Sequence, residues 1–346
     1  MLKPIKHILV IRLSAMGDVA MTIPVLSAFN TQYPHIKITV LTRPFFAPFF
    51  RELKNTTIFP IDLNGKHKGI LGLYKLSKEL KSQQIDAVAD LHNVLRSKIL
   101  KCFLYNVKTV HIDKGRKEKK ALIAGNIFQP LKTTHQRYAD VFKYLGFEIN
   151  LSQTQFSKKK DLTPNLKKLI GYKTQKLIGI APFAAHKSKM YSIDKMEIVI
   201  SHLSKTSTVL LFGGGQKEID ILKRIERKYE NVFNLAGKLD LNQELDVISN
   251  LNLMVSMDSG NAHIATMFGI DVITLWGVTH PYAGFYPFHQ KPENALLADR
   301  DLYPKIPTSI YGNKFPKGYE NAINSIQPND VIQKIENVLK YHHNLQ

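Results

Sequence analysis

A carboxylate, a hydroxyl, a glycine and a histidine lie close together in the segment Met257–Thr266, which reads MDSGNAHIAT. The run Leu251–Ser256 before it is typical of a buried strand, and the apolar pattern after it predicts a helix that ends near Gly269. A turn from a strand into a helix presents backbone N–H groups and the positive end of the helix dipole. These groups and a nearby carboxylate suit phosphates and sugar hydroxyls. An ordinary capped helix after a buried strand has the same pattern.

A second candidate group is Asp18, which follows the predicted strand 7–12 and the turn Ser14–Gly17. A carboxylate at this place lies at the mouth of a sheet, where it could act as a general base. Aspartate at the start of a helix is also a common capping residue, so both roles stay open. The turn is not a dinucleotide-binding fingerprint, because it contains one glycine and no G-x-G-x-x-G sequence occurs.

Two further loops that follow predicted strands contain residues suited to a nucleotide. The segment Lys187–Lys189 offers two positive charges and a hydroxyl to a pyrophosphate, although a solvated basic loop has the same composition. The loop Gly213–Gly215 would let a base or a ribose lie against the backbone, with Glu218 or Gln216 in reach of ribose hydroxyls. The run Trp276–Pro281 follows another strand and could line the same pocket.

These loops require a scaffold in which strands alternate with helices. Strands are expected at residues 7–12, 36–42, 58–63, 87–91, 107–112, 177–182, 208–212, 232–235, 251–256 and 271–276. Helices are expected at residues 19–33, 71–83, 194–204, 218–229, 243–249, 262–268 and 328–341, with Pro24 in a first turn or at a kink. Such alternation indicates crossover connections and parallel sheets.

A stretch without clear periodicity at residues 150–175 separates two alternating blocks. We therefore predict an α/β protein with one domain over residues 1–160, a second over 172–327 and a closing helix over 328–346. Two open parallel sheets in tandem predict a cleft between them, with ligands outside the carboxyl ends of the strands.

The net charge of +20 is concentrated in one half of the sequence. Residues 1–170 contain 29 Lys and Arg against 11 Asp and Glu, whereas residues 171–346 contain 19 against 17. A field of this sign attracts nucleic acid, anionic lipid head groups or a multiply phosphorylated substrate. A charge that serves solubility alone is the other interpretation.

The remaining composition favours a cytosolic globular protein. The single cysteine, Cys102, excludes an internal disulfide and a cysteine metal cluster, and no histidine cluster of metal-binding type occurs. No apolar run approaches the roughly 20 residues that span a bilayer. The first apolar segment is interrupted by Arg12 and Asp18, which makes it a poor signal peptide.

In combination, these segments resemble the bacterial heptosyltransferase family of inverting glycosyltransferases. The matching residues span most of the chain and are Ile11–Asp18 with Pro24 downstream, Asp90–His92 with Arg96 and Ser97, His135–Tyr138, Lys189, Met257–His263 and Leu275–Gly277. The Gly-Asp opening and the later Asp-Ser-Gly-x-x-His segment are fairly specific together.

The resemblance implies the GT-B fold, in which two Rossmann-like domains face each other across a cleft and the closing helix packs back toward the first. It implies that Asp18 is the base that takes a proton from the acceptor hydroxyl. The donor-binding candidates are Lys189, Asp258, Ser259, Gly260, His263, Gly213 and Glu218. The acceptor-binding candidates are Ser14, Met16, Gly17, Arg43, Arg96 and Arg137.

The function implied is metal-independent transfer of a heptose, or a related sugar, from ADP-heptose to a lipopolysaccharide core or lipid A-type acceptor. No cofactor is expected, because a lysine and helix N–H groups can neutralise the leaving diphosphate. The expected location is the cytoplasm, with peripheral association with the anionic surface of the inner membrane. Two alternatives are a nucleotide-sugar epimerase of the same architecture and a basic nucleic-acid-binding protein. The second lacks interleaved basic and aromatic residues, so no nucleic-acid partner is expected.

Overall fold

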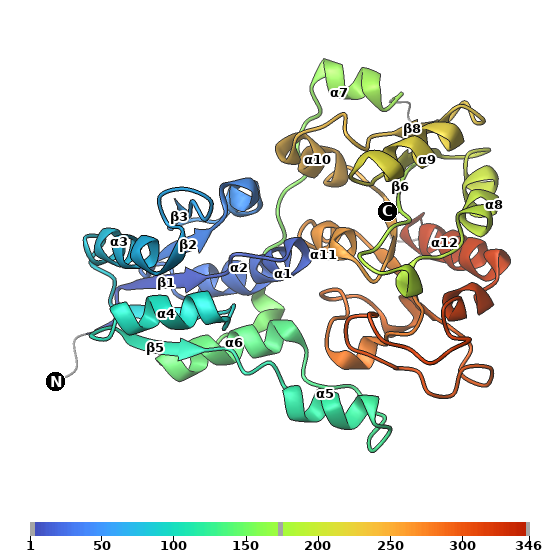
Figure 1. The fold of residues 1–346 in the computed structure, drawn as a ribbon. Helices are drawn as coiled ribbons and strands as arrows, with labels where there is room; N and C mark the ends of the chain where they lie inside the picture. Colours follow the sequence, from blue (N-terminus) through green and yellow to red (C-terminus); the bar gives the residue numbers. More distant parts are fainter. Residues whose placement is uncertain (1–3, 172–175, 344–346) are drawn as a thin grey trace. The chain divides into compact units, whose positions relative to one another are not determined.

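The structure is a computed structural model that describes residues 4–171 and 176–343. The chain folds into two α/β units: the first comprises Met1–Gly115 and Lys132–Phe156, the second Arg116–Leu131 and Ser157–Gln346 (Figure 1). The division at 156 falls inside the break expected at 150–175, but the assignment of 116–131 to the second unit was not predicted. The predicted domain start at 172 and the last helix residues, 344–346, lie outside the described residues.

The first unit contains a parallel sheet with the strand order β3-β2-β1-β4-β5. Its strands are β1 (His7–Ile11), β2 (Lys37–Thr42), β3 (Thr56–Pro60), β4 (Ala87–Asp90) and β5 (Lys108–His111). Its helices are α1 (Met16–Ala20), α2 (Thr22–Gln32), α3 (Gly69–Lys81), α4 (Leu95–Phe103) and α6 (Thr134–Leu145), with short 3-10 turns at Pro44–Phe50 and Leu151–Gln153. Every residue of β1 is buried, which explains why this central strand is apolar from Ile8 to Ile11.

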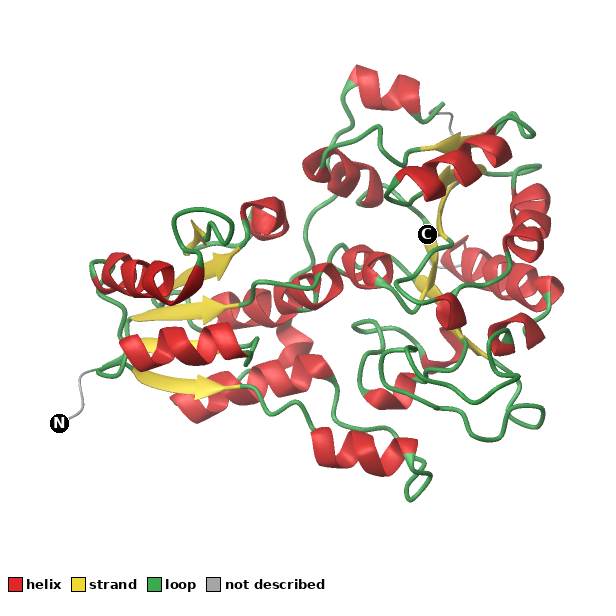
Figure 2. Ribbon diagram, viewed as in Figure 1, coloured by secondary structure: helices red, strands yellow, loops and turns green. Residues whose placement is uncertain are grey.

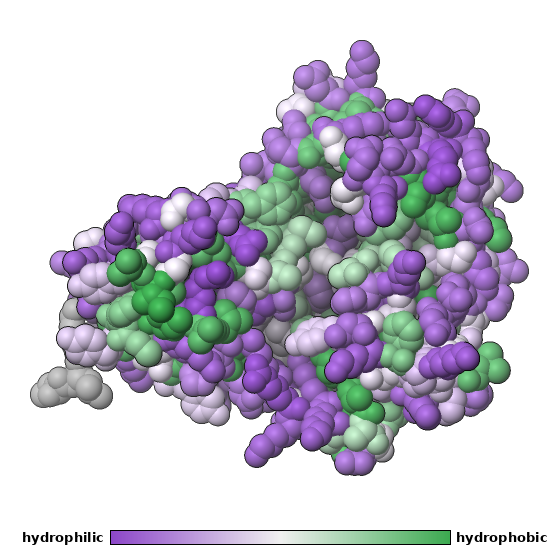
Figure 3. Space-filling view, viewed as in Figure 1, coloured by the Kyte–Doolittle hydropathy of each residue, from purple (hydrophilic) through white to green (hydrophobic). Residues whose placement is uncertain are grey.

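Helices cover both faces of this sheet (Figure 2). On one face, Leu9 and Ile11 of β1 pack in a cluster with Leu76 of α3 and Leu100 of α4. The helices α2 and α6 form another layer and contact each other. The surface over α3 and α4 nevertheless keeps apolar side chains on its outer side (Figure 3).

The second unit contains a parallel sheet with the strand order β11-β10-β9-β6-β7-β8. Its strands are β6 (Leu177–Ala181), β7 (Thr208–Leu211), β8 (Val232–Asn234), β9 (Leu253–Met257), β10 (Val272–Trp276) and β11 (Ala295–Leu297). Its helices are α5 (Arg116–Ile123), α7 (Pro164–Leu169), α8 (Ile193–Leu203), α9 (Gln216–Glu226), α10 (Leu241–Ile248), α11 (Gly260–Thr266) and α12 (Pro328–His343). Short 3-10 turns occur at Lys187–Lys189, Pro281–Ala283, Pro292–Asn294 and Ala322–Ser325.

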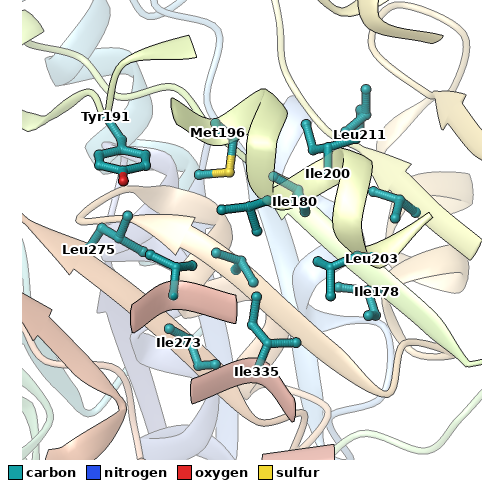
Figure 4. Close-up of a cluster of buried hydrophobic side chains, with 14 of the residues drawn as sticks. Ile178, Ile180, Tyr191, Met196, Ile200, Leu203, Leu211, Ile273, Leu275 and Ile335 are labelled. Carbon is teal, nitrogen blue, oxygen red and sulfur yellow. The ribbon is translucent and has the colours of Figure 1, made fainter. Parts of the chain in front are cut away.

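The core of the second unit includes the closing helix. Ile178 and Ile180 of β6 and Ile273 of β10 lie beside Ile335 of α12 in one buried cluster (Figure 4). α12 also packs against α8. The buried side chains of this helix therefore belong to the second unit, and its expected return toward the first domain stays a prediction.

The predicted strands and helices are found with small shifts at their ends, but the strand β11 and four helices were not predicted. The prediction that Pro24 occupies a first turn is confirmed, because α2 begins at Thr22 after the short helix α1. The edge strand β3 begins at Thr56, two residues before the predicted start. The helices α4, α5, α6 and α7 were not predicted, although α6 has clear end signals in Thr133, which caps it, and Gly146 in the left-handed conformation.

The two units share the positive charge more evenly than the two halves of the sequence do. The first unit contains 20 Lys and Arg against 9 Asp and Glu, a net charge of +11. The second contains 28 against 19, a net charge of +9. The reason is that the lysine-rich segments 116–131 and 157–170 belong to the second unit. In the parts of the chain that the structure describes, no helix is long and apolar enough to cross a membrane.

Candidate functional site

Each sheet has one point where the strand order reverses direction. In the first unit this point lies between β1 and β4, and in the second it lies between β6 and β9. Loops that leave the carboxyl ends of the two strands diverge there and leave room for a ligand. The candidate residues Asp18 and His92 follow β1 and β4, and Lys189 and Asp258 follow β6 and β9.

Asp18 lies in the first turn of α1, where its carboxylate has two contacts. Its Oδ2 atom lies 2.6 Å from Nη2 of Arg12 and accepts a hydrogen bond from the backbone N–H of Ala15 at 3.3 Å. The side chain of Asp18 is 27% exposed, whereas that of Arg12 is 7% exposed. The capping role and the base role are therefore compatible, because both contacts use Oδ2 and the side chain still reaches the surface.

Arg12 was not predicted as a functional residue, yet it connects the two loops of this site. Its Nη1 atom donates to the backbone carbonyl of Leu91 at 2.7 Å, in the loop after β4. Its guanidinium also lies 5.9 Å from the ring centre of Tyr138, whose hydroxyl donates to the backbone carbonyl of Asp18. A charged residue directly after a buried strand was the available sequence signal.

His92 lies in the same loop after β4 and is almost completely buried. Its backbone N–H donates to Oδ1 of Asp90, a buried carboxylate that also forms an ion pair with Lys101 at 2.8 Å. Its Nδ1 atom has no hydrogen-bond partner among the described residues. Burial, assisted by the charges of Arg12 and Lys114, lowers the pKa of His92 to about 4, so the imidazole is neutral at pH 7.

The other acceptor candidates fall into two groups. Ser14 lies in the loop before α1, Met16 and Gly17 are the first two residues of α1, and all three are half-buried. Arg43 follows β2 and Arg96 lies at the start of α4, and both are exposed near the carboxyl edge of the sheet. No ligand contact tests these candidates, which remain predictions.

Arg137 has a structural position that the sequence did not reveal. It is 4% exposed, and its guanidinium donates to the backbone carbonyls of Lys132 at 3.2 Å and Asp113 at 3.4 Å. A Cβ atom at Gly115 would lie 2.3 Å from this guanidinium, so glycine is required there. Arg137 thus joins the two ends of the segment 116–131 where the chain leaves and re-enters the first unit.

In the second unit, the structure brings the predicted donor residues Lys189 and Asp258 into contact. Nζ of Lys189 lies 2.8 Å from Oδ2 of Asp258, and both side chains are nearly buried, at 13% and 10% exposure. Thr279, in the loop after β10, donates its hydroxyl to the same oxygen at 2.9 Å. Three loops from β6, β9 and β10 therefore converge on one carboxylate.

A fourth segment holds the lysine loop from the outside. The hydroxyl of Ser188 donates to the backbone carbonyl of Gly312 at 2.5 Å. A Cβ atom at Gly312 would lie 2.6 Å from Cδ of Lys189, and one at Gly277 would lie 2.2 Å from the carbonyl oxygen of Ser188. The two glycines allow a close approach that fixes the path of the Lys189 side chain.

Ser259, Gly260 and His263 occupy the turn into α11 as predicted from the sequence. Ser259 is the N-terminal boundary residue of the helix, but its hydroxyl lies 3.0 Å from that of Ser256 instead of capping the backbone. His263 is buried in α11. Ser259 and Gly260 directly follow Asp258, the carboxylate partner of Lys189, in the chain.

Gly213 and Glu218 lie at the carboxyl end of β7, the neighbour of β6. The Glu218 carboxylate accepts a hydrogen bond from the backbone N–H of Gly214 at 2.8 Å, which closes the glycine loop onto the first turn of α9. This contact gives Glu218 a structural role, and ribose binding by Glu218 remains a prediction. Among the described residues, no group of three or more His, Cys, Asp or Glu side chains is arranged to hold a metal ion.

Comparison with known proteins identifies the family of the chain. The profile of glycosyltransferase family 9 (heptosyltransferase) matches residues 73–306. The chain is 26% identical to the lipopolysaccharide core heptosyltransferase OpsX of Haemophilus influenzae, over 80% of each chain. It is 25% identical to lipooligosaccharide heptosyltransferase 2 of Campylobacter jejuni, over 93% of this chain and 95% of the relative.

Solved structures share the fold. A glycosyltransferase family 9 protein from Veillonella parvula superimposes with a TM-score of 0.75 at 19% identity, covering 97% of this chain and 98% of the other. ADP-heptose lps heptosyltransferase II of E. coli superimposes with a TM-score of 0.68 at 18% identity, covering 97% and 99%. The predicted α/β class of GT-B type is confirmed. The chain belongs to glycosyltransferase family 9, the heptosyltransferase family, and is a glycosyltransferase.

Proposed function

We propose that this protein transfers a heptose from ADP-heptose to a phosphorylated lipopolysaccharide core acceptor, with Asp18 as the general base and without a metal ion. The observation that carries the proposal is the convergence of Lys189, Asp258 and Thr279 at the switch point of the second sheet. An ammonium group beside a fixed carboxylate suits a ligand that has both phosphates and hydroxyls, as a nucleotide sugar does.

In the proposed reaction, the acceptor hydroxyl oxygen attacks C1 of the sugar while the bond between C1 and the diphosphate oxygen breaks. The electron pair of that bond leaves with ADP, and the proton of the hydroxyl passes to the carboxylate of Asp18. Lys189 neutralises the charge that develops on the diphosphate, which is the largest electrostatic demand of the step. Attack from the side opposite the leaving group inverts the configuration at C1.

On the acceptor side, Arg12 would position the base. Its guanidinium holds Oδ2 of Asp18 at 2.6 Å and is itself fixed to the loop after β4. A general base must point at the acceptor hydroxyl, and these contacts of Arg12 would set the orientation of the Asp18 carboxylate before the acceptor binds. Ser14, Met16, Gly17, Arg43 and Arg96 are the candidate contacts for the acceptor, and a lipid-borne acceptor would place the enzyme at the anionic inner face of the inner membrane.

The variant Asp18→Asn tests the proposal, because asparagine keeps the shape but cannot take the proton. We expect transfer from ADP-heptose to fall by about 10²–10⁴-fold, the usual contribution of a general base, while the calorimetric Kd for ADP stays within about twofold. Asp140→Asn is the control, since this half-buried carboxylate of α6 forms an ion pair with Lys132 and is not a candidate site residue. Transfer by Asp18→Asn at near the native rate would contradict the role of Asp18.

The donor can be identified independently of the base. A thermal-shift screen with ADP-, UDP-, GDP- and CMP-sugars measures which ligand stabilises the protein, because stabilisation grows with ligand concentration relative to Kd. We expect ADP-heptose to raise the Tm most, with no change when EDTA is present. A larger effect of another nucleotide sugar would redirect the assignment of the donor.

A further inference from the structure

We propose that the outer face of α3 and α4 docks the protein on an anionic lipid bilayer. The face is defined by four exposed apolar side chains: Ile70, Leu71, Tyr74 and Leu95 are 63%, 78%, 45% and 74% exposed. Figure 3 shows apolar side chains gathered over these two helices. The inference deepens the proposed function by naming the surface that meets the membrane, and it rests on that function only in so far as the acceptor is lipid-borne.

The apolar residues form part of two stripes with helical spacing. On α3, Leu71, Tyr74, Lys78 and Lys81 follow one another at intervals of three or four residues and are all exposed. On α4, Leu95, Lys98 and Cys102 form a similar exposed stripe. Each stripe thus begins with an apolar side chain and continues with lysine, so the outer face of each helix offers both apolar and cationic groups.

The two stripes lie side by side. α3 and α4 pack against each other, and the ring of Tyr74 contacts that of Phe103 with their centres 5.4 Å apart. Both helices follow strands of the same parallel sheet, so both begin at its carboxyl edge. The exposed apolar residues at the helix starts are therefore found at the same end of this face.

The charge of the face selects an anionic partner. Lys75, Lys78, Lys81, Arg96 and Lys98 are exposed on the two helices. The carboxylate in these two helices, Glu79, is already paired with Lys66 at 2.9 Å. Nζ of Lys78 lies 4.6 Å from the ring centre of Tyr74, which places a cation at the border of the apolar group.

A bilayer fits this face better than a protein partner does. Lysine is depleted in protein–protein interfaces, whereas lysine beside exposed leucine, isoleucine and tyrosine suits the boundary between lipid head groups and acyl chains. The aliphatic part of each lysine can lie along the apolar layer while its ammonium group reaches lipid phosphates.

The experiment uses the full chain, without donor or acceptor, so that its result is independent of transfer. Co-sedimentation is measured with vesicles of phosphatidylethanolamine and phosphatidylglycerol and with vesicles of phosphatidylcholine. We expect at least tenfold tighter binding to the anionic vesicles. The double variant Leu71→Ser/Leu95→Ser is expected to lose at least tenfold in that affinity, and Lys78→Gln/Lys98→Gln to reduce its salt dependence. The control is Tyr144→Ser on α6, where tyrosine is 70% exposed.

The single native cysteine gives a local readout at the same face. An environment-sensitive fluorophore on Cys102 is expected to shift to shorter wavelength when anionic vesicles are added. A matched control carries Cys102→Ser and Tyr144→Cys and moves the label to α6. The inference would be overturned if the double leucine variant bound anionic vesicles as well as the native protein does. It would also be overturned if the label at Cys102 did not shift, or if the leucine substitutions abolished self-association of the protein and left vesicle binding unchanged. Circular dichroism checks that the variants are folded.

Discussion

Lys189 and Asp258 contact each other through nearly buried side chains, so neither can be removed without affecting the other. We predict that Lys189→Ala raises the Kd for ADP by about 10–100-fold, because a charged contact to phosphate contributes about 1.5–3 kcal/mol. The variant also leaves the Asp258 carboxylate without its cation, so the unfolding temperature is expected to fall. Isothermal calorimetry and thermal unfolding measure the two effects.

A control for this prediction lies in the same loop. Lys187 is exposed two residues earlier, and Lys187→Ala is expected to leave the Kd for ADP within about threefold. Equal Kd values for Lys189→Ala and the unchanged protein would remove Lys189 from the phosphate site.

Glu244 in α10 predicts an unusual dependence of stability on pH. Burial raises the pKa of its carboxyl from 4.5 to about 7. Between about pH 4.5 and pH 7 the carboxyl of Glu244 therefore keeps its proton in the folded state, whereas in the unfolded state it has released it. The associated stability is full below pH 4.5 and is lost as the pH rises through 7. We predict that Glu244→Gln raises the free energy of unfolding at pH 8 by about 1–3 kcal/mol, measured by urea denaturation at pH 5 and pH 8. A variant less stable than the native protein at pH 8 would contradict the burial argument.

At the scale of elements, close contacts between loops decide the geometry of the donor site. Gly312 has φ of +82°, and a Cβ atom there would meet the side chain of Lys189. We predict that Gly312→Ala costs about 1–2 kcal/mol for the backbone conformation alone and also weakens ADP binding, because Lys189 must move. Gly318→Ala is the matched control: φ is +89°, with nothing within 4 Å of the added atom. Equal Kd values for ADP in the two variants would contradict the proposed effect of Gly312 on Lys189.

The elements themselves were largely predictable because their signals are local. The strands β1, β6 and β9 are short apolar runs followed by polar turns, and this pattern alone located Asp18, Lys189 and Asp258 after strands. α4 escaped prediction because it has 9 residues against 13 in α3, so its helical period repeats over fewer turns.

At the scale of the whole molecule, each unit contains a neutral buried histidine. Burial lowers the pKa of His92 in the first unit and of His280 in the second to about 4. The unfolded chain binds these protons near pH 6.5, so the stability they contribute is full above pH 6.5 and is lost as the pH falls toward 4. Because Glu244 has the opposite effect over this range, the histidine contribution is measured as a difference between two proteins. We predict that His280→Asn gains unfolding temperature relative to the unchanged protein as the pH falls from 7 to 5. Calorimetry of both proteins at both pH values tests this, and an equal change in the two would argue against the assignment.

The distribution of positive charge between the two units differs from its distribution between the two halves of the sequence. The excess of lysine in residues 1–170 predicted a positive first domain, but the segments 116–131 and 157–170 fold with the second unit, and the two units carry +11 and +9. Arg137 fixes the two points where the chain leaves and re-enters the first unit, because its guanidinium donates to the backbone carbonyls of Asp113 and Lys132 on either side of the segment 116–131. Domain membership depends on long-range packing, which has no local signature.

The sequence alone determined the α/β alternation, the loops after the strands and the family resemblance, because hydrophobic period and turn composition act over a few residues. Only the tertiary structure decided that Lys189, Asp258 and Thr279 meet at one oxygen atom, and that Arg12 holds Asp18. The physical reason is the order of the strands: β6 and β9 are distant in the chain but adjacent in the sheet, and only their hydrogen bonding brings the two loops together.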